Sequence, residues 1–231
     1  TASAQYTPAD SLSLAQKIKN FNPKSKKIYR SIEVIKNAGS HLYTGTQLNN
    51  FLEYGFASID VRYSWQSTEE QEWARKTYYP KFGFGVYTGF LGDPKTFGNP
   101  SAIYGFMNYN LFRVSRTQNA DMSLAVGLTY DLAKFDPETN PMNDAIGSRV
   151  TLFFDLKMGL VYQMTRELDL LYGLTLSHFS NGRTFTPNLG LNMLGLYLGT
   201  RYNYNRDQHK LNRNPYTTDV LPARYLKPSK D

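Results

Sequence analysis

The sequence predicts an all-β protein: an eight-stranded antiparallel transmembrane β-barrel with a polar N-terminal leader and a C-terminal extension. Apolar residues recur at every second position through most of the chain, which is the period of a strand. Aromatic residues make up 15% of the sequence, a content typical of sheets and membrane-interface girdles. No apolar run approaches the roughly 18 residues of a membrane helix. Barrel strands need no such run, because only one of their faces meets lipid.

Composition divides the chain into three segments. Residues 1–30 are polar and basic and form the expected periplasmic leader, in which 11–20 could be a short helix. Residues 31–204 form the expected barrel. Residues 205–231 are polar and contain three prolines, so we expect a periplasmic extension or the start of a longer segment. The opening Thr1-Ala2-Ser3-Ala4 resembles the small-residue end of a secretory signal, from which we expect the protein beyond the inner membrane.

The first four predicted strands differ in how clearly their faces alternate. The weakest is 32–36. In 57–65 the odd-numbered residues are apolar or aromatic and oppose polar or charged residues. In 82–90 the even-numbered residues are mainly apolar and oppose glycines and one tyrosine. The fourth strand, 102–114, has ambiguous faces because two asparagines interrupt one side.

The last four predicted strands alternate more regularly. In 122–132 the even-numbered residues are apolar or aromatic and oppose small or polar residues. In 150–162 every even-numbered residue is apolar or aromatic, while charges lie on the opposite face. A run this long is typical of a tilted membrane strand between lipid and a polar lumen. Strands 168–180 and 190–202 complete an even number, which can close without a free edge.

The connections alternate between short and long, which predicts short periplasmic turns and longer extracellular loops. The link 66–79 is an exception, because it is long although the pattern predicts a short periplasmic turn there. Within one long loop, 140–143 has a turn-like sequence without assigned chemistry. The short turns are 115–120 and 164–167, and the longer loops are 37–53, 91–101, 135–148 and 181–189.

Charge and cysteine content narrow the range of functions. The net charge is +7, with basic residues concentrated near both ends, which indicates solvated termini or contact with a phosphate-rich surface. No nucleic-acid partner is expected. The absence of cysteine excludes disulfides and thiol nucleophiles, and with only three histidines a metal site is disfavoured. We expect His41 in an outer loop and His209 in the tail, both as surface residues.

The end of the seventh strand carries the most informative residues. His178 and Ser180 are two positions apart, so their side chains point the same way. Because the other even-numbered residues of this strand are apolar or aromatic, we expect both side chains on the lipid face. If the following hairpin is symmetric, Asn192 lies across from His178. Two interpretations remain open: ordinary polar residues in the headgroup layer, or a base beside a hydroxyl nucleophile on the outer wall.

The surrounding motif favours the second interpretation. His178-x-Ser180-Asn181-Gly182, followed by Pro187-Asn188-x-Gly190, resembles the lipid A 3-O-deacylase (PagL) family of outer-membrane barrels and its acyloxyacyl-hydrolase-like relatives. The specific match covers about 174–194, and a weaker strand-pattern resemblance covers 31–204.

The resemblance implies an outer-membrane serine esterase, a lipid A deacylase that needs no cofactor. Its site would face the outer leaflet, with Ser180 as nucleophile and His178 as base. The amides of Asn181 and Gly182 and the side chain of Asn188 would stabilise the oxyanion. The implied partners are the acyl chains and phosphates of lipid A or lipopolysaccharide, with outer-membrane lipids. No oligomeric state is implied.

One residue departs from the family pattern, which has an acid where this chain has Asn192. An amide can orient a histidine but cannot stabilise the imidazolium with a full charge. We therefore expect Asn192 as the third member of the site, with either weaker activity or help from another acid. The loop residues Asp136, Glu138 and Asp144 are candidates.

Three other functions remain as alternatives. A phospholipase or general esterase could use the same geometry. A structural or lipid-binding barrel could keep the fold without catalysis. A soluble β-sandwich or lipocalin-like carrier is disfavoured, because its long apolar faces would be exposed to water.

Overall fold

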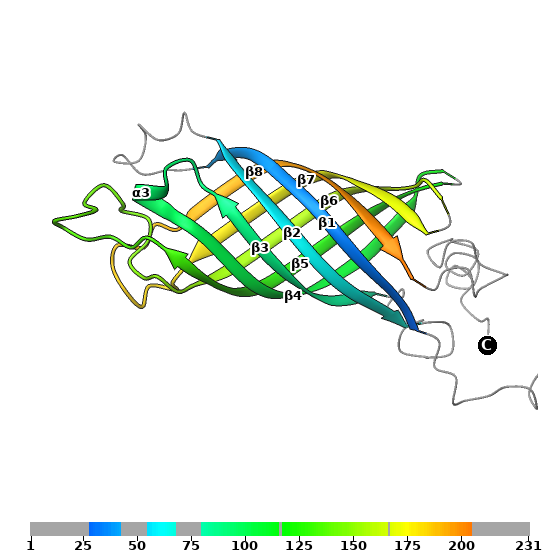
Figure 1. Ribbon diagram of the computed structural model, residues 1–231, viewed down its shortest axis with the longest axis horizontal. Helices are drawn as coiled ribbons and strands as arrows, with labels where there is room; N and C mark the ends of the chain where they lie inside the picture. Colours follow the sequence, from blue (N-terminus) through cyan, green and yellow to red (C-terminus); the bar gives the residue numbers. More distant parts are fainter. Residues whose placement is uncertain (1–27, 43–54, 68–79, 116, 166, 205–231) are drawn as a thin grey trace, which may run out of the picture.

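The described residues of the computed structural model form one closed barrel of antiparallel strands (Figure 1). Each strand pairs with its neighbours in sequence, and β1 closes the barrel against β8. The described ranges are 28–42, 55–67, 80–115, 117–165 and 167–204. The strands are β1 (Ile28–His41), β2 (Phe56–Ser67), β3 (Lys81–Phe90), β4 (Gly98–Arg113), β5 (Gln118–Leu132), β6 (Thr151–Gln163), β7 (Leu168–Ser180) and β8 (Leu191–Asn203).

The predicted eight-stranded all-β architecture is confirmed, and β1, β2, β4 and β5 are longer than their sequence patterns indicated. β1 spans 14 residues and begins inside the segment assigned to the leader. β4 begins at Gly98, directly after the four-residue helix α3 (Pro94–Phe97). The helix expected at 11–20, the rest of the leader and the extension from 205 onward lie outside the described residues. No helix within the described ranges is long and apolar enough to cross a membrane.

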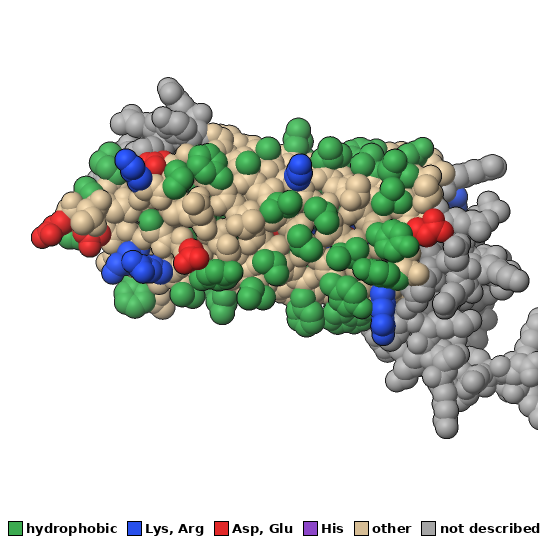
Figure 2. Space-filling model, in the orientation of Figure 1, with side chains coloured by type: hydrophobic (Ala, Val, Ile, Leu, Met, Phe, Trp, Pro, Cys, Tyr) green, Lys and Arg blue, Asp and Glu red, His purple; other side chains and the backbone are tan. Residues whose placement is uncertain are grey.

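The two faces of the sheet separate as the alternation predicts. Apolar side chains cover the outer wall between the ends of the barrel (Figure 2). Leu196 is 66% exposed and Phe84 is 64% exposed, although both lie in the middle of regular strands. Large apolar side chains in this position need a nonaqueous environment, so the wall is suited to lipid.

The lumen contains a buried network of charged side chains. Asp155 accepts from Arg62 at 3.1 Å and from Lys157 at 2.7 Å, and Lys157 also lies 3.3 Å from Asp60. Arg201 pairs with Glu33 at 2.7 Å. Because each of these charges has an opposite partner, the polar face predicted for the lumen can be buried.

The loop end of the lumen is filled by aromatic and aliphatic side chains rather than polar ones. The ring of Phe153 lies 5.3 Å from that of Phe179 and 5.1 Å from that of Tyr87. Leu191, at the start of β8, is also buried in this cluster. Phe179 and Leu191 are neighbours of His178 and Asn192 in sequence, so their inward packing fixes the backbone that carries the outward residues.

His41 does not lie on a loop surface, as the sequence analysis expected. It is the last residue of β1 and is 7% exposed. Its Nε2 forms a 2.9 Å hydrogen bond with the carbonyl oxygen of Leu91, and its ring stacks on Phe97 with centroids 5.4 Å apart. The longer β1 turns this side chain into the lumen, where it joins the packing at the loop end.

Candidate active site

The β7–β8 hairpin places His178, Ser180 and Asn192 on the outer face of the barrel. Asn192 is the register partner of His178, as expected from a symmetric hairpin. Ser177 and Phe179, the neighbours of His178, are buried, whereas Leu176 on the same face as His178 is 38% exposed. The alternation therefore directs the imidazole and the hydroxyl away from the lumen.

The imidazole of His178 lies between β6 and β8. Its Nδ1 is 2.7 Å from Oδ1 of Asn192, and the ring of Phe154 lies on the other side with centroids 6.1 Å apart. An amide oxygen only accepts hydrogen bonds, so this contact requires the proton on Nδ1. In the neutral ring Nε2 then carries the lone pair, which is the arrangement that a base needs.

Gly190 gives His178 the space for this position. A Cβ at Gly190 would lie 2.9 Å from Cε1 of His178 and 3.1 Å from the carbonyl oxygen of Phe179. The backbone of Gly190 also has a φ of 74°, which favours glycine. Any side chain here would meet the imidazole, so the glycine in the motif has a steric reason.

Two N–H donors converge on the hydroxyl oxygen of Ser180. The side-chain amide nitrogen of Asn188 lies 3.2 Å from Oγ, and the backbone nitrogen of Gly182 lies 3.3 Å from it. No hydrogen bond joins His178 to Ser180 within the described part of the chain. The hairpin thus brings base, hydroxyl and donors together, with the hydroxyl turned toward the donors.

Asn181 is engaged in the loop itself. Its backbone N–H donates to Oδ1 of Asn188 at 3.1 Å, so this amide already has an acceptor. Its side chain donates to the carbonyl oxygen of Phe185 at 2.9 Å and accepts from the backbone nitrogen of Arg183 at 3.0 Å. These two side-chain contacts close the loop after Ser180, and the backbone N–H of Asn181 holds the side chain of Asn188.

The loop between β5 and β6 supports the candidate site, and the sequence analysis missed this role. The backbone nitrogen of Gly190 donates to the carbonyl oxygen of Ala145 at 3.1 Å. A Cβ at Gly147 would lie 2.8 Å from the carbonyl oxygen of Pro187, so the two loops pack with no room for a side chain. The position of the 181–190 loop therefore depends on its neighbour.

Asn143 organises the supporting loop. The side chain is fully buried, and its nitrogen donates to the carbonyl oxygens of Thr96 and Ala133, both at 2.8 Å. Its oxygen accepts from the backbone nitrogen of Ile146 at 3.1 Å. The turn-like 140–143 stretch thus ties three chain segments together. Only its turn character could be recognised beforehand.

The loop acids considered as helpers do not take the place of Asn192. Oδ1 of Asp136 accepts from the backbone nitrogens of Thr139 at 2.8 Å and Glu138 at 3.0 Å. These hydrogen bonds, that from Thr139 foremost, lower the pKa of Asp136. In the described residues no carboxylate contacts His178.

Comparison with solved structures identifies similar small barrels. Neisserial surface protein A is 12% identical at a TM-score of 0.46, covering 77% of this chain and 97% of that one. The outer membrane enzyme PagL is 12% identical at a TM-score of 0.49, covering 72% and 97%. The N-terminal barrel domain of Pseudomonas aeruginosa OprF is 10% identical at a TM-score of 0.41, covering 77% and 100%. No curated protein matches the chain.

The family comparison is more specific. A family model described as lipid A 3-O-deacylase (PagL) matches residues 57–201. That range is more than half of the chain, and it contains all of β7, the 181–190 loop and most of β8. The chain therefore belongs to the lipid A 3-O-deacylase (PagL) family.

Proposed function

We propose that this protein is an outer-membrane serine esterase that removes an ester-linked acyl chain from lipid A. Membership in a family of lipid A deacylases supports the substrate and the outer-membrane location. The mechanistic proposal rests on one observation: Asn192 holds His178 with Nδ1 occupied, while Ser180, the next outward residue on β7, lies beside two N–H donors.

In the proposed reaction, Nε2 of His178 accepts the proton of Ser180 as Oγ attacks the acyl carbonyl carbon. This needs a rotation of the Ser180 hydroxyl toward the imidazole, and such contacts commonly tighten only with substrate bound. The tetrahedral intermediate collapses, and His178 returns the proton to the departing sugar oxygen. Water then attacks the acyl-serine ester by the same route and releases the fatty acid.

The oxyanion of this reaction would be stabilised by Asn188 and Gly182. Both N–H groups lie beside Ser180 Oγ, so an oxyanion on a carbon bonded to that oxygen would form within their reach. We assign Asn181 a positioning role instead, because its backbone N–H already donates to Asn188. Its side chain holds the loop closed around the same amide.

Asn192 would act as the orienting third member. It can fix the tautomer and direction of His178 as an asparagine does in Cys-His-Asn sites. It cannot neutralise the imidazolium that forms during the reaction. We therefore propose a functional but slower site than one with a carboxylate at this position.

The outward direction of the site would set the route of the substrate. Leu174 and Leu176 continue the face of His178 and Ser180 along β7, and both are exposed on the wall. An acyl chain lying against these residues would present its ester to Ser180 from within the membrane. The proposed orientation therefore places the site at the level of the outer leaflet.

Mass spectrometry of lipid A tests this proposal in cells that express wild type or Ser180→Ala. We expect loss of one acyl chain with wild type only, and covalent labelling of wild-type Ser180 by a serine-directed phosphonate. Identical lipid A spectra with both barrels folded would refute the enzyme assignment and favour a non-catalytic lipid-binding barrel. Equal cleavage of defined phospholipids would indicate a general esterase.

A further inference from the structure

Two exposed arginines lie just beyond the candidate active site, at the loop end of the barrel. Leu152 of β6 pairs with Ser180 of β7, which is the last register pair of these two strands on the loop side. Arg149 lies three residues beyond Leu152, and Arg183 lies three residues beyond Ser180. At roughly 3.3 Å per residue, the backbone of each arginine is within about 10 Å of this pair.

The two segments that carry these arginines stay side by side beyond the strands. A Cβ at Gly147 would lie 2.8 Å from the carbonyl oxygen of Pro187 and 3.1 Å from that of Phe185. Arg149 therefore lies between two contacts, the last strand pair on one side and the packing of Gly147 on the other. Arg183 lies between the same two contacts on the neighbouring segment, so the fold brings both arginines to one small region.

The backbone of Arg183 is held in an unusual conformation. Its φ is 64°, a left-handed value that is uncommon for residues other than glycine. Its N–H donates to Oδ1 of Asn181 at 3.0 Å, and the N–H of Asn181 donates in turn to Oδ1 of Asn188 at 3.1 Å. The position of this arginine is therefore linked to the amide that lies beside Ser180. Residues in such sparsely populated conformations are concentrated at catalytic and ligand-binding sites.

The guanidinium groups of Arg149 and Arg183 are available to an anion. Both side chains are exposed. Within the described ranges, no carboxylate forms an ion pair with either of them, and neither guanidinium group donates a hydrogen bond. Two such groups suit a phosphate, because their planar sets of N–H donors match its oxygens and their charges match its negative charge.

We propose that Arg149 and Arg183 bind a phosphate on the headgroup of the lipid that Ser180 deacylates. This inference rests on the proposed function. In lipid A the phosphates and the acyl esters are attached to the same sugar headgroup. With the ester at Ser180 and the acyl chain along the apolar wall, that headgroup lies on the loop side, where the two arginines are. The site then recognises both halves of the amphiphile.

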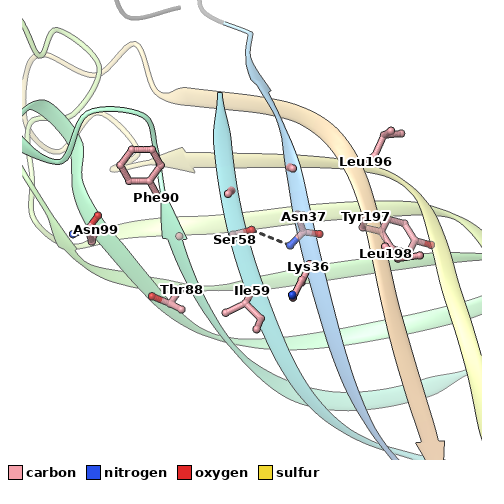
Figure 3. A pocket seen from close by; sticks show the side chains of 13 residues that line it. Lys36, Asn37, Ser58, Ile59, Thr88, Phe90, Asn99, Leu196, Tyr197 and Leu198 are labelled. Carbon is pink, nitrogen blue, oxygen red and sulfur yellow. Dashed lines mark hydrogen bonds between the residues drawn. The ribbon is translucent and has the colours of Figure 1, made fainter. Parts of the chain in front are cut away.

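The apolar groove in the barrel wall belongs to a different region (Figure 3). It has a volume of about 860 Å³ and is lined by residues of β8, β1, β2 and β3, with Lys36 among them. Lys36 is level with Leu198 of β8 and Tyr172 of β7, which is eight residues, or about 26 Å, from Ser180 along that strand. This exposed lysine is therefore a cation remote from the proposed phosphate site, and it provides a matched control.

Steady-state kinetics in neutral detergent micelles test the phosphate contact with a double variant that carries Arg149→Met and Arg183→Asn. Asparagine tolerates a positive φ, so the second substitution removes the charge without adding strain. We expect KM on phosphorylated lipid A to rise about tenfold or more with kcat nearly unchanged, as for a lost binding contact. On enzymatically dephosphorylated lipid A, we expect wild type and the double variant to have equal KM.

Two variants that remove a cation elsewhere are the controls. Lys36→Met acts beside the groove and Arg113→Met acts at the opposite end of the barrel, and we expect both to leave KM unchanged. We also expect an uncharged phosphonate to label Ser180 at the wild-type rate in the double variant, because that probe needs no phosphate site. An unchanged KM for the double variant would overturn the proposal, as would an equal rise on the phosphorylated and the dephosphorylated lipid.

Binding without turnover separates this inference from the proposed function. Native mass spectrometry of Ser180→Ala, with and without the two arginine substitutions, measures retention of phosphorylated and dephosphorylated lipid A. If wild type is inactive yet the arginine substitutions weaken retention of the phosphorylated lipid alone, the esterase assignment fails and the phosphate site stands. If they leave its retention unchanged, or weaken retention of both lipids equally, the phosphate site fails whatever the activity.

Discussion

In the proposed mechanism, the contact between His178 and Asn192 lets an amide take over part of a carboxylate's role. The 2.7 Å contact places the proton on Nδ1 and directs the ring, which are the geometric tasks of the acid in a triad. The electrostatic task remains undone, because the amide has no net charge to stabilise the imidazolium.

The first prediction separates these two tasks at residue 192. Asn192→Asp keeps the acceptor and adds a charge, so we expect kcat to rise, by about tenfold, and the acid limb of the pH–rate profile to move to higher pH. Asn192→Ala removes the acceptor and lowers kcat by about 10- to 100-fold. Deacylation measured from pH 5 to 9 checks both; equal activity of Asn192→Ala and wild type would remove the orienting role.

The second prediction concerns Gly190. Gly190→Ala puts a Cβ 2.9 Å from His178 Cε1 on a backbone with positive φ, so the imidazole must move. We expect kcat to fall about 10- to 100-fold, since misplacement by about 1 Å can cost that much. We expect the electrophoretic mobility of the folded barrel, with and without heating, to be the same as that of wild type. Gly105→Ala, whose Cβ would find its nearest atom at 4.0 Å, serves as the control and keeps full activity.

Residue-scale prediction from sequence worked where strand geometry dictates direction. The side-by-side placement of His178 and Ser180, and the pairing with Asn192, follow from alternation and a symmetric hairpin. The hydrogen bond from Asn181 N–H to Asn188 could not be foreseen in this way. It depends on the path of an irregular loop, which leaves no periodic pattern in the sequence.

At the scale of elements, the candidate site depends on two neighbouring loops rather than on one hairpin. Gly190 hydrogen-bonds to Ala145, and Asn143 ties the loop containing Ala145 to Thr96 beside β4. The loop that follows Ser180 is therefore held by contacts from residues far away in the sequence.

The third prediction tests this support through Asn143. Asn143→Ala leaves the carbonyl oxygen of Ala133 without this donor and the buried backbone nitrogen of Ile146 without its acceptor, while Thr96 keeps the donor from Asn140. Each unsatisfied buried group costs roughly 1–3 kcal/mol. We expect faster hydrogen exchange in both 133–150 and 181–190, together with a reduced kcat. Met142→Ala, at an exposed neighbouring position, is the control. Faster exchange confined to 133–150 would show that the loops are not coupled.

Sequence patterns located the strands of this barrel well, and they failed where polar residues face the lumen. β1 was expected only at 32–36, because Glu33 and Asn37 on the lumen face and Ser40 on the outward face weaken the apolar alternation. Inside a barrel such residues are compatible with a strand when they find partners, as Glu33 does with Arg201. His41 was misplaced for the same reason.

At the scale of the whole molecule, the lumen combines paired charges with an aromatic cluster. Asp155 is central to the charged part, since Arg62, Lys157, Thr175 and Ser177 all donate to it. The sequence predicted a polar lumen from alternation alone. It could not predict which charges pair, because the register across non-adjacent strands decides that.

The fourth prediction concerns the stability of this arrangement. Asp155→Ala leaves the buried cations Arg62 and Lys157 with fewer acceptors, so we expect the free energy of unfolding to fall by about 3–5 kcal/mol. Urea titration in lipid vesicles, followed by electrophoretic mobility, measures it. Asp131→Asn, an exposed position with a φ of 63° that asparagine tolerates, is the control. A similar loss in both variants would remove the special role of the network.

The packed lumen and the outward hairpin together have a kinetic consequence. If Ser180 is the nucleophile, as proposed, its place on the outer wall means that it meets molecules that diffuse laterally in the bilayer. Turnover then follows the mole fraction of lipid in one leaflet rather than its amount per volume of solution. Diluting the substrate with inert lipid slows the reaction, whereas adding buffer does not, and a short ester dissolved in water stays a poor competitor.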